Sequence, residues 1–332
     1  METRFARFVR EFPGRLAMPF GAYAGLEITG ESVEDIVSSP GSQFRAVMAL
    51  HERYRTPVLL TALDQSVEAE TFGCEIRMSE RELPAVVGRR VTNADDIASL
   101  PDPVPGDART RVPLETAWRL VAEAEGPIPV LGSMLGPLSL AGRLYGVSEI
   151  LEAIAVDPET IEVLLGRMTA FLCQYALAFR ETGAWGVIVA EPGAGLLSPA
   201  GLGRFSTPFM KRIIEVAEAP DFTVILHNCG AKIVHLEYVL ESDAKIYHFG
   251  APMDIVAALG KVGPDVILGG NLDPAAVFMR GTPQAVGEAT RALLEATRSY
   301  KNFIISSGCD IPPGAPLANL NAFYRAVAEF NK

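Results

Sequence analysis

Residues 222–230 read Phe222-Thr-Val-Ile-Leu-His-Asn-Cys-Gly230. A short run rich in apolar and β-branched residues gives way to polar side chains and then to a glycine. Such a run is typical of a buried strand, and Gly230 lets the chain turn sharply where the strand ends. The same unit recurs along the chain, and its repetition determines the expected fold.

The chain contains eight such runs, which predict eight parallel strands: Arg15–Phe20, Val58–Leu63, Ile128–Ser133, Gly186–Ala190, Phe222–His227, Lys245–Phe249, Val266–Gly270 and Asn302–Ser306. Segments with helical periodicity lie between them: Glu149–Ile154, Glu159–Ala178, Phe205–Ala217, Ile233–Leu240, Ile255–Val262 and Pro283–Ser299. Four sites pair an N-cap residue with a proline at the first helical position: Asp157-Pro158, Ser198-Pro199, Asp273-Pro274 and Thr282-Pro283. Eight strands that alternate with helices predict an α/β fold of the (β/α)8 TIM barrel type.

A doubly wound sheet would show a similar alternation, so periodicity alone does not separate the two folds. No G-x-G-x-x-G motif follows an early strand. Polar residues stand just after the strands throughout the chain, and a barrel gathers all these positions on one face. We therefore expect a single barrel domain over residues 1–332, with an N-terminal helical extension and an insertion at about residues 80–124.

Composition and charge exclude several classes of protein. Lys and Arg number 29 against 40 Asp and Glu, a formal net charge of −11, and the basic residues form no long run. Nucleic acid is therefore not an expected partner. The N-terminal METRFARFVREF alternates charged and apolar residues, which predicts a short amphipathic helix and not a secretory signal. We expect no membrane segment and a cytoplasmic protein.

Two cysteines and a histidine end two of the predicted strands. His227 and Cys229 stand two positions apart, so their side chains leave the strand on the same side. Cys309 follows the strand Asn302–Ser306 at the same relative height, and a barrel opens both strand ends onto one face. One imidazole and two thiolates suit Zn²⁺, and three protein ligands leave a fourth position free, as in catalytic sites. A sulfur-rich zinc site of this kind activates a thiol better than it activates water.

The remaining histidines and cysteines are interpreted as ordinary. His51 falls in a charged helical stretch, His235 on a helix, and His248 ends a strand that has no cysteine partner. Cys74 and Cys173 are expected to be buried apolar residues, since four widely spread cysteines do not make a disulfide framework for a chain of this size.

Motifs over nearly the whole chain resemble one known group of proteins. They are Leu63-Asp-Gln-Ser-Val-Glu-Ala-Glu-Thr-Phe-Gly73, Gly136-Pro-Leu-Ser-Leu-Ala141, Glu191-Pro192 with Leu197-Ser-Pro199, His227-Asn-Cys-Gly230, Gly270-Asn-Leu-Asp-Pro274 and Ser307-Gly-Cys-Asp-Ile-Pro-Pro-Gly-Ala-Pro316. Together they resemble the uroporphyrinogen decarboxylase superfamily, a family of (β/α)8 barrels. Within it, the resemblance is to zinc-dependent methyltransferases that move a methyl group from a corrinoid protein to coenzyme M.

The resemblance implies a zinc site formed by His227, Cys229 and Cys309. It also implies methylcobalamin, carried by a partner corrinoid protein, as the methyl donor and a small thiol as the acceptor. A zinc-bound thiolate would attack the methyl carbon and Co(I) would leave. No corrinoid-binding motif is found in this chain, so the cofactor is expected to arrive on the partner. Four further residues are secondary candidates for substrate binding: Asp64, Glu191, Asn228 and Asn271. Glu191 is an equally good candidate for a fourth ligand or for a hydrogen-bond anchor.

Three alternatives stay open at the level of sequence. The first is a uroporphyrinogen decarboxylase, which shares Asp64 but carries an arginine-rich stretch where this chain has Met18-Pro-Phe-Gly-Ala-Tyr-Ala-Gly25, and a histidine where it has Cys309. The second is a zinc enzyme whose activated thiol opens another electrophile, such as an epoxide. The third is a zinc-binding or corrinoid-docking protein without turnover.

Overall fold

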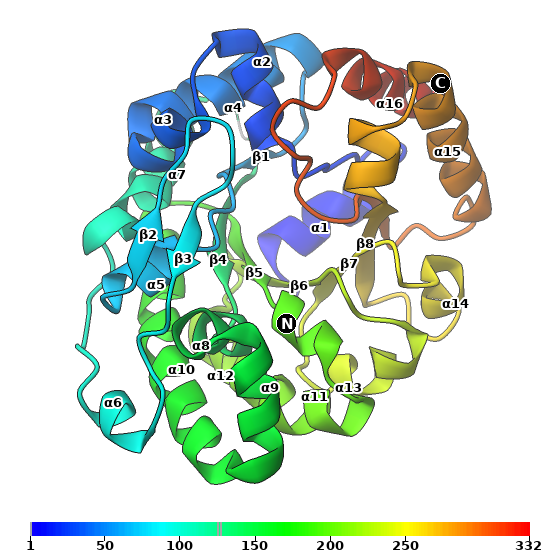
Figure 1. Cartoon of the computed structure of the whole chain (residues 1–332). Coiled ribbons are helices and arrows are strands. Elements are labelled where there is room, and N and C mark those ends of the chain that lie inside the picture. The colour runs from blue at the N-terminus through cyan, green and yellow to red at the C-terminus, as the bar shows by residue number, and fades with distance from the viewer. Residues whose placement is uncertain (1, 125, 127) are drawn as a thin grey trace.

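A computed structural model of the chain describes residues 2–124, 126 and 128–332. Within these residues the nine strands are β1 (Leu59–Leu60), β2 (Glu75–Arg77), β3 (Ala85–Val87), β4 (Val130–Leu135), β5 (Gly186–Ala190), β6 (Thr223–Asn228), β7 (Ile246–Phe249), β8 (Ile267–Leu272) and β9 (Phe303–Ser307). Seven of them form one parallel sheet in the order β1-β4-β5-β6-β7-β8-β9, while β2 and β3 pair as a separate antiparallel hairpin. Figure 1 shows the parallel strands curled into a ring with helices around the outside.

The α-helices of the described chain are α1 (Arg4–Glu11), α2 (Leu26–Thr29), α3 (Val33–Ser38), α4 (Pro40–Tyr54), α5 (Val67–Thr71), α6 (Ala94–Ala98), α7 (Arg111–Glu123), α8 (Pro137–Tyr145), α9 (Val147–Val156), α10 (Pro158–Glu181), α11 (Pro199–Phe205), α12 (Thr207–Ala217), α13 (Leu236–Leu240), α14 (Ile255–Leu259), α15 (Pro283–Ala296) and α16 (Leu317–Phe330). Shorter helical turns are η1 (Ala22–Gly25), η2 (Ala108–Thr110), η3 (Pro192–Leu196), η4 (Ile233–His235) and η5 (Pro274–Met279). The four predicted N-caps are confirmed, because each side chain accepts a backbone N–H of its helix.

Seven of the eight predicted strands join the parallel sheet. The eighth segment, Arg15–Phe20, is not a strand in this structure and contacts β9 through a single parallel bridge between Ala17 and Ile305. Two backbone hydrogen bonds support that bridge, from Met18 N to Ile305 O (2.9 Å) and from Ile305 N to Leu16 O (3.0 Å). The structure therefore has a curled seven-stranded sheet with one loosely attached edge segment, and a fully closed eight-stranded barrel is not established.

One residue from each parallel strand points into the centre of the ring. This interior layer comprises Leu60, Leu131, Ile188, Ile225, Ile246, Ile267 and Ile304. The predicted N-terminal helix forms as α1 and buries Phe5, Ala6 and Val9 against the same layer. Helix α1 thus closes the end of the ring where the strands begin, which leaves the other end for chemistry.

The segment predicted as an insertion has two parts. The hairpin β2–β3 and the short helix α6 elaborate the connection between β1 and β4, whereas α7 packs against α4 and β4 as a covering helix of the sheet. The predicted insertion, about residues 80–124, thus contains β3, α6 and α7, while β2 begins before it at Glu75.

Among the residues that the structure describes, one helix is long and apolar enough to span a membrane by composition, α10. Of its most apolar window, 56% is buried inside the structure. Phe171, Tyr175 and Phe179 of this helix pack in the main apolar cluster, so α10 is a core helix of this fold.

We predict that Ile225→Ala lowers the free energy of unfolding by roughly 2–5 kcal/mol, because it opens a cavity in the close-packed interior layer. Urea denaturation followed by circular dichroism measures the change. The matched control is Val163→Ala on α10, whose side chain is 60% exposed and which should change stability by less than about 0.5 kcal/mol. Equal effects of the two substitutions would contradict the assigned interior layer.

Candidate metal centre

The ligand atoms of His227, Cys229 and Cys309 all lie within 4.8 Å of one another. They come from the ends of β6 and β9, which are separated in the sheet by β7 and β8. His227 is fully buried, and the two cysteines are partly exposed. The structure thus brings together the three residues that the sequence placed on one face, although their role as metal ligands stays a prediction.

Close backbone contacts at three glycines hold these strand ends together. A Cβ atom on Gly250, which follows β7, would lie 2.1 Å from the carbonyl oxygen of Cys229. A Cβ atom on Gly308, which follows β9, would lie 3.0 Å from the Cα of Gly250. On the other side of the loop, a Cβ on Gly195 would lie 2.6 Å from the Cα of Gly230. The four loops that carry these residues can approach this closely only because no side chain stands between them.

The imidazole of His227 is oriented by a chain of hydrogen bonds. In the sheet register His227 pairs with His248, and their Nδ1 atoms are 2.9 Å apart. His248 Nε2 lies 2.8 Å from Ser306 Oγ, which itself donates to the carbonyl oxygen of Met18 at 2.6 Å. Since the serine donates its hydrogen to a carbonyl, it accepts from His248 Nε2–H. His248 Nδ1 then accepts from His227 Nδ1–H.

This direction of donors leaves Nε2 of His227 as the atom with a free lone pair. Nε2 is buried and has no hydrogen-bond partner among the described residues. An orphaned buried nitrogen is costly unless something binds it, and a ring nitrogen of His227 lies within 4.8 Å of both cysteine sulfurs. A donor set of one imidazole nitrogen and two sulfurs fits Zn²⁺.

The two cysteines share one proton. The hydrogen bond from the Cys309 thiol, with a smaller contribution from His227, lowers the pKa of Cys229 to about 4. The same hydrogen bond, together with burial, raises the pKa of Cys309 far above its usual range. In the absence of a cation only one of the pair is a thiolate, and a bound divalent cation favours the thiolate form of both.

Sequence reasoning treated His248 as ordinary, and the structure corrects this. It is fully buried, and the ring of Phe20 stacks on it with a centroid distance of 4.2 Å. Burial and the neighbouring His227 lower the pKa of His248 well below its usual value, so that it stays neutral. Only the register of β6 and β7 could have revealed the role of His248, because it is this register that places His248 beside His227.

Two of the four secondary candidates have side chains engaged in shaping loops. Asn228 Oδ1 accepts from the backbone N–H of Gly230 (3.1 Å) and of Ala231 (2.9 Å), which fixes the turn after Cys229. Asn271 Nδ2 donates to the carbonyl oxygens of Gly250 (3.1 Å) and Met253 (2.7 Å). These contacts use Oδ1 of Asn228 and Nδ2 of Asn271, and the substrate-binding roles of both residues stay predictions.

Glu191 anchors the start of α8. Its carboxylate accepts from the backbone N–H groups of Leu138 and Ser139, both at 2.8 Å, and it is fully buried. Burial raises the pKa of Glu191. The side chain is not a member of the group around His227, so these contacts favour the hydrogen-bond anchor over the fourth ligand.

Asp64 is held in an ion pair with Arg109, which contributes a second ion pair to Glu70 at 2.7 Å. The other carboxylate oxygen of Asp64 accepts from the backbone N–H and the hydroxyl of Ser66. Nearby Glu68 is fully buried and accepts from the backbone N–H of Leu135 at 2.9 Å. Burial raises the pKa of Glu68 to about 8.

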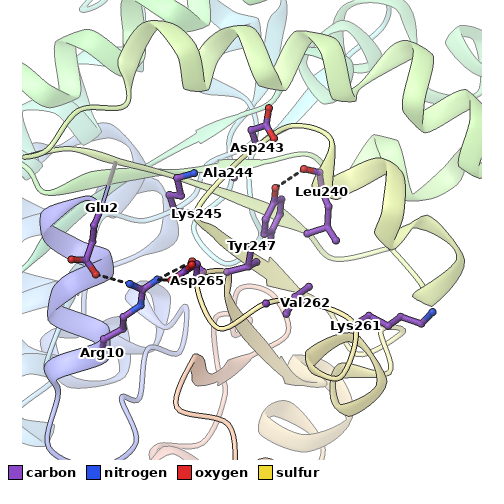
Figure 2. Close-up of a pocket in the computed structure, with 12 residues that line it drawn as sticks. Glu2, Arg10, Leu240, Asp243, Ala244, Lys245, Tyr247, Lys261, Val262 and Asp265 are labelled. Carbon is purple, nitrogen blue, oxygen red and sulfur yellow. Dashed lines mark hydrogen bonds and ion pairs between the residues drawn. The ribbon is translucent and has the colours of Figure 1, made fainter.

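A cavity of about 330 Å³ adjoins the candidate centre. It lies between α8, α9, η3 and the loop after β6, and its lining includes Gln65, Leu138, Arg143, Val147, Leu196 and Cys229. Larger cavities lie at the other end of the strands, one of about 490 Å³ where β7 and β8 begin and one of about 610 Å³ where β8 and β9 begin. Figure 2 shows the first of these, in which Arg10 contacts Glu2 and Asp265. Ligands of parallel α/β sheets bind at the carboxyl ends of the strands, which favours the cavity beside Cys229.

Comparisons with known proteins agree with this arrangement. The model of the family described as uroporphyrinogen decarboxylase (URO-D) matches residues 15–330. A methylcobamide:CoM methyltransferase, MtbA of Methanosarcina acetivorans, is 30% identical over 84% of this chain and 80% of its own. A uroporphyrinogen decarboxylase of Actinobacillus succinogenes is 24% identical over 74% of this chain and 71% of its own. The solved structure of a methyltransferase from Methanosarcina mazei has the same fold, with a TM-score of 0.88 at 21% identity, and covers 99% of this chain and 98% of its own.

We predict that Gly250→Ala weakens metal binding, because the added Cβ collides with the backbone of Cys229 and displaces one sulfur. Zinc retained after gel filtration, measured by atomic emission, should fall well below one ion per chain. The control is Gly166→Ala on α10, where a Cβ meets no heavy atom within 4 Å and where alanine should stabilise the helix slightly. Full zinc content in Gly250→Ala would contradict the proposed assembly of the loops.

We also predict a pH-dependent effect of Glu68→Gln. Because the pKa of Glu68 rises from 4.5 to about 8 on folding, the wild-type chain loses stability relative to the variant as the pH rises from about 4.5 to about 8. Below this window the carboxyl is protonated in both states and the difference is constant. Urea denaturation at pH 5 and pH 8 measures the free energy of unfolding of wild type minus that of the variant, and a difference that does not fall between pH 5 and pH 8 would exclude a buried, protonated Glu68.

Proposed function

The chain belongs to the uroporphyrinogen decarboxylase family, and on this premise we propose that it is a methyltransferase that moves a methyl group from a methylated corrinoid to a small thiol. The observation that carries the proposal is the group of one imidazole nitrogen and two sulfurs within 4.8 Å. We further propose that this group, His227, Cys229 and Cys309, binds Zn²⁺ and constitutes the catalytic site. A zinc ion held there would lower the pKa of a coordinated thiol and present it as a thiolate.

The protein's own residues would orient and shelter the reactants. The chain from Ser306 through His248 holds the ring of His227 with Nε2 directed at the sulfurs. The turn capped by Asn228 keeps Cys229 at the cavity wall. Alignment of two reactants is the main requirement of a displacement reaction, and no described group in the cavity needs to act as a general acid.

The proposed reaction is one in-line displacement. The acceptor thiol gives up its proton to solvent, and its sulfur attacks the methyl carbon of the corrinoid. A sulfur–carbon bond forms while the carbon–cobalt bond breaks, and the electron pair of that bond stays on cobalt as Co(I). The corrinoid would be carried by a partner protein that docks over the strand ends.

Three further features belong to this proposal. We infer a closed (β/α)8 barrel in which Leu16, Met18 and Phe20 complete the interior layer as the eighth segment. We infer that the chain, residues 1–332, forms one domain. The cytoplasmic location stays a prediction, as do the substrate-binding roles of Asp64, Glu191, Asn228 and Asn271.

We predict that purified protein incubated with methylcobalamin and 2-mercaptoethanesulfonate produces cob(I)alamin and the S-methyl thioether under anaerobic conditions. Absorbance of cob(I)alamin and mass spectrometry of the thioether measure turnover. Cys229→Ala and Cys309→Ala should lower both zinc content and rate to the background of the uncatalysed reaction. The control is Cys173→Ala, a buried cysteine on α10 that should keep both.

Other outcomes would identify the alternatives. Release of carbon dioxide from uroporphyrinogen would point to the decarboxylase, and thioether formation from an epoxide but not from methylcobalamin would point to a different electrophile. Tight zinc binding with no alkylated product from any donor would point to a binding protein. Each of these results without methyl transfer would overturn the proposed function.

A further inference from the structure

The four cysteines are free, and their surroundings divide them into two groups. Cys74 and Cys173 are buried in the main apolar cluster, and burial raises the pKa of both thiols. Cys229 and Cys309 are partly exposed, and Cys229 also lines the 330 Å³ cavity beside the strand ends. Because a reactive cysteine must be accessible to its reagent, reactivity is expected in the second group only.

The sulfurs of Cys229 and Cys309 are within hydrogen-bonding distance. The Cys309 thiol donates to the sulfur of Cys229, and both sulfurs belong to the group of atoms that lie within 4.8 Å of one another. The backbone of Gly250 contacts that of Cys229, and the backbone of Gly308, the neighbour of Cys309, contacts that of Gly250. A disulfide joins sulfurs about 2 Å apart, and rotation of the two thiols about their Cα–Cβ bonds brings them closer.

A disulfide between these cysteines would compete with a metal ion. Cysteine binds a metal as the thiolate, and neither sulfur of a disulfide is a thiolate. Of the three proposed ligands, only the imidazole of His227 would then remain. Zinc sites in proteins use three or four side-chain ligands, so the metal-bound and disulfide states exclude each other.

We propose that Cys229 and Cys309 form a reversible disulfide, which switches the site between a metal-binding state and an inactive one. The oxidant is a small dialkyl disulfide, a class of molecule that can reach Cys229 through the adjoining cavity. The loss of metal binding rests on the proposed zinc site, whereas formation of the disulfide does not.

Two steps of thiol–disulfide exchange form the bond. The sulfur of Cys229 attacks one sulfur of the small disulfide, whose S–S bond breaks, and the first small thiolate leaves. The sulfur of Cys309 then attacks Cys229 Sγ, and the second small thiolate leaves. Each departing thiolate takes up the proton of one protein thiol through solvent. The two cysteines are thereby oxidised by two electrons, and the small disulfide is reduced to two thiols.

Oxidation of the full-length, chelator-treated protein with bis(2-hydroxyethyl) disulfide tests the proposal. The number of free thiols, titrated after denaturation, should fall from four to two per chain. Peptide mapping without reductant should find Cys229 joined to Cys309. Dithiothreitol should restore all four thiols together with zinc binding. Excess zinc added before the oxidant should slow the loss of thiols roughly tenfold or more, because metal-bound thiolates are withheld from exchange.

Single substitutions separate the roles of the two cysteines. Cys309→Ala should stop at a mixed disulfide on Cys229, seen as an increase in intact mass. Cys229→Ala should react more slowly, because Cys309 is not among the residues that line the cavity. The matched control carries both Cys74→Ala and Cys173→Ala, retains the reactive pair, and should change from two thiols to none. Circular dichroism verifies that each variant is folded.

Four thiols remaining in the oxidised wild-type protein would overturn the proposal, as would a disulfide that involves Cys74 or Cys173. Undiminished zinc binding by the oxidised protein would overturn it equally. None of these measurements uses a methyl donor. A protein that binds zinc and forms the disulfide but transfers no methyl group would therefore contradict the proposed function alone and support the switch.

Discussion

The close approach of three loops at the ends of β6, β7 and β9 is the constraint on which the rest of the site depends. Parallel strands end at one edge of the sheet, but this alone would leave the sulfurs of Cys229 and Cys309 two strands apart. The gap closes because the backbone of Gly250 contacts that of Cys229, and the backbone of Gly308 contacts that of Gly250. Side chains at these positions would force the loops apart, and the nitrogen and the two sulfurs would no longer face a common point.

Placing two histidines inside an apolar interior costs free energy, and the structure offsets this cost by a complete chain of donors and acceptors. Phe20 packs on both rings, stacked on His248 and edge-on to His227 at 5.2 Å. The hydroxyl of Ser306 donates to the carbonyl oxygen of Met18, and this fixes which atom donates in each hydrogen bond of the series. Within this series of hydrogen bonds, the imidazole nitrogen left without a partner is Nε2 of His227. The free-energy cost of an unpaired buried nitrogen therefore falls on an atom that a bound ligand can pair.

Features that depend on interactions between residues close in sequence were predictable, and features that depend on distant residues were not. Strand ends and N-caps depend on residues within a few positions, and the sequence located them, together with His227, Cys229 and Cys309. His248 was missed because its role depends on the register of two strands 21 residues apart. The hydrogen-bond and ion-pair partners of Asn271 and Asp64, such as Met253 and Arg109, were not predictable from the sequence because tertiary contacts set them. The pairing of Arg15–Phe20 fell short of a strand for the same reason, since its neighbours come from opposite ends of the chain.

The segment Met18–Gly25 connects the fold to the choice of chemistry. Decarboxylases of this family are expected to carry arginines here, to hold the carboxylates of their substrate. In this chain the segment instead supplies Phe20, whose ring supports the histidine pair, and whose backbone N–H donates to Ser307 Oγ at 3.0 Å. Arginine cations at this place would lie beside His227 and would oppose a second cation at its Nε2 by Coulomb repulsion. An apolar segment introduces no such repulsion, and the ring of Phe20 covers the side of the histidine pair that faces the interior. The aromatic residue is therefore compatible with the metal ion proposed at Nε2 of His227, whereas arginines beside it would oppose that ion.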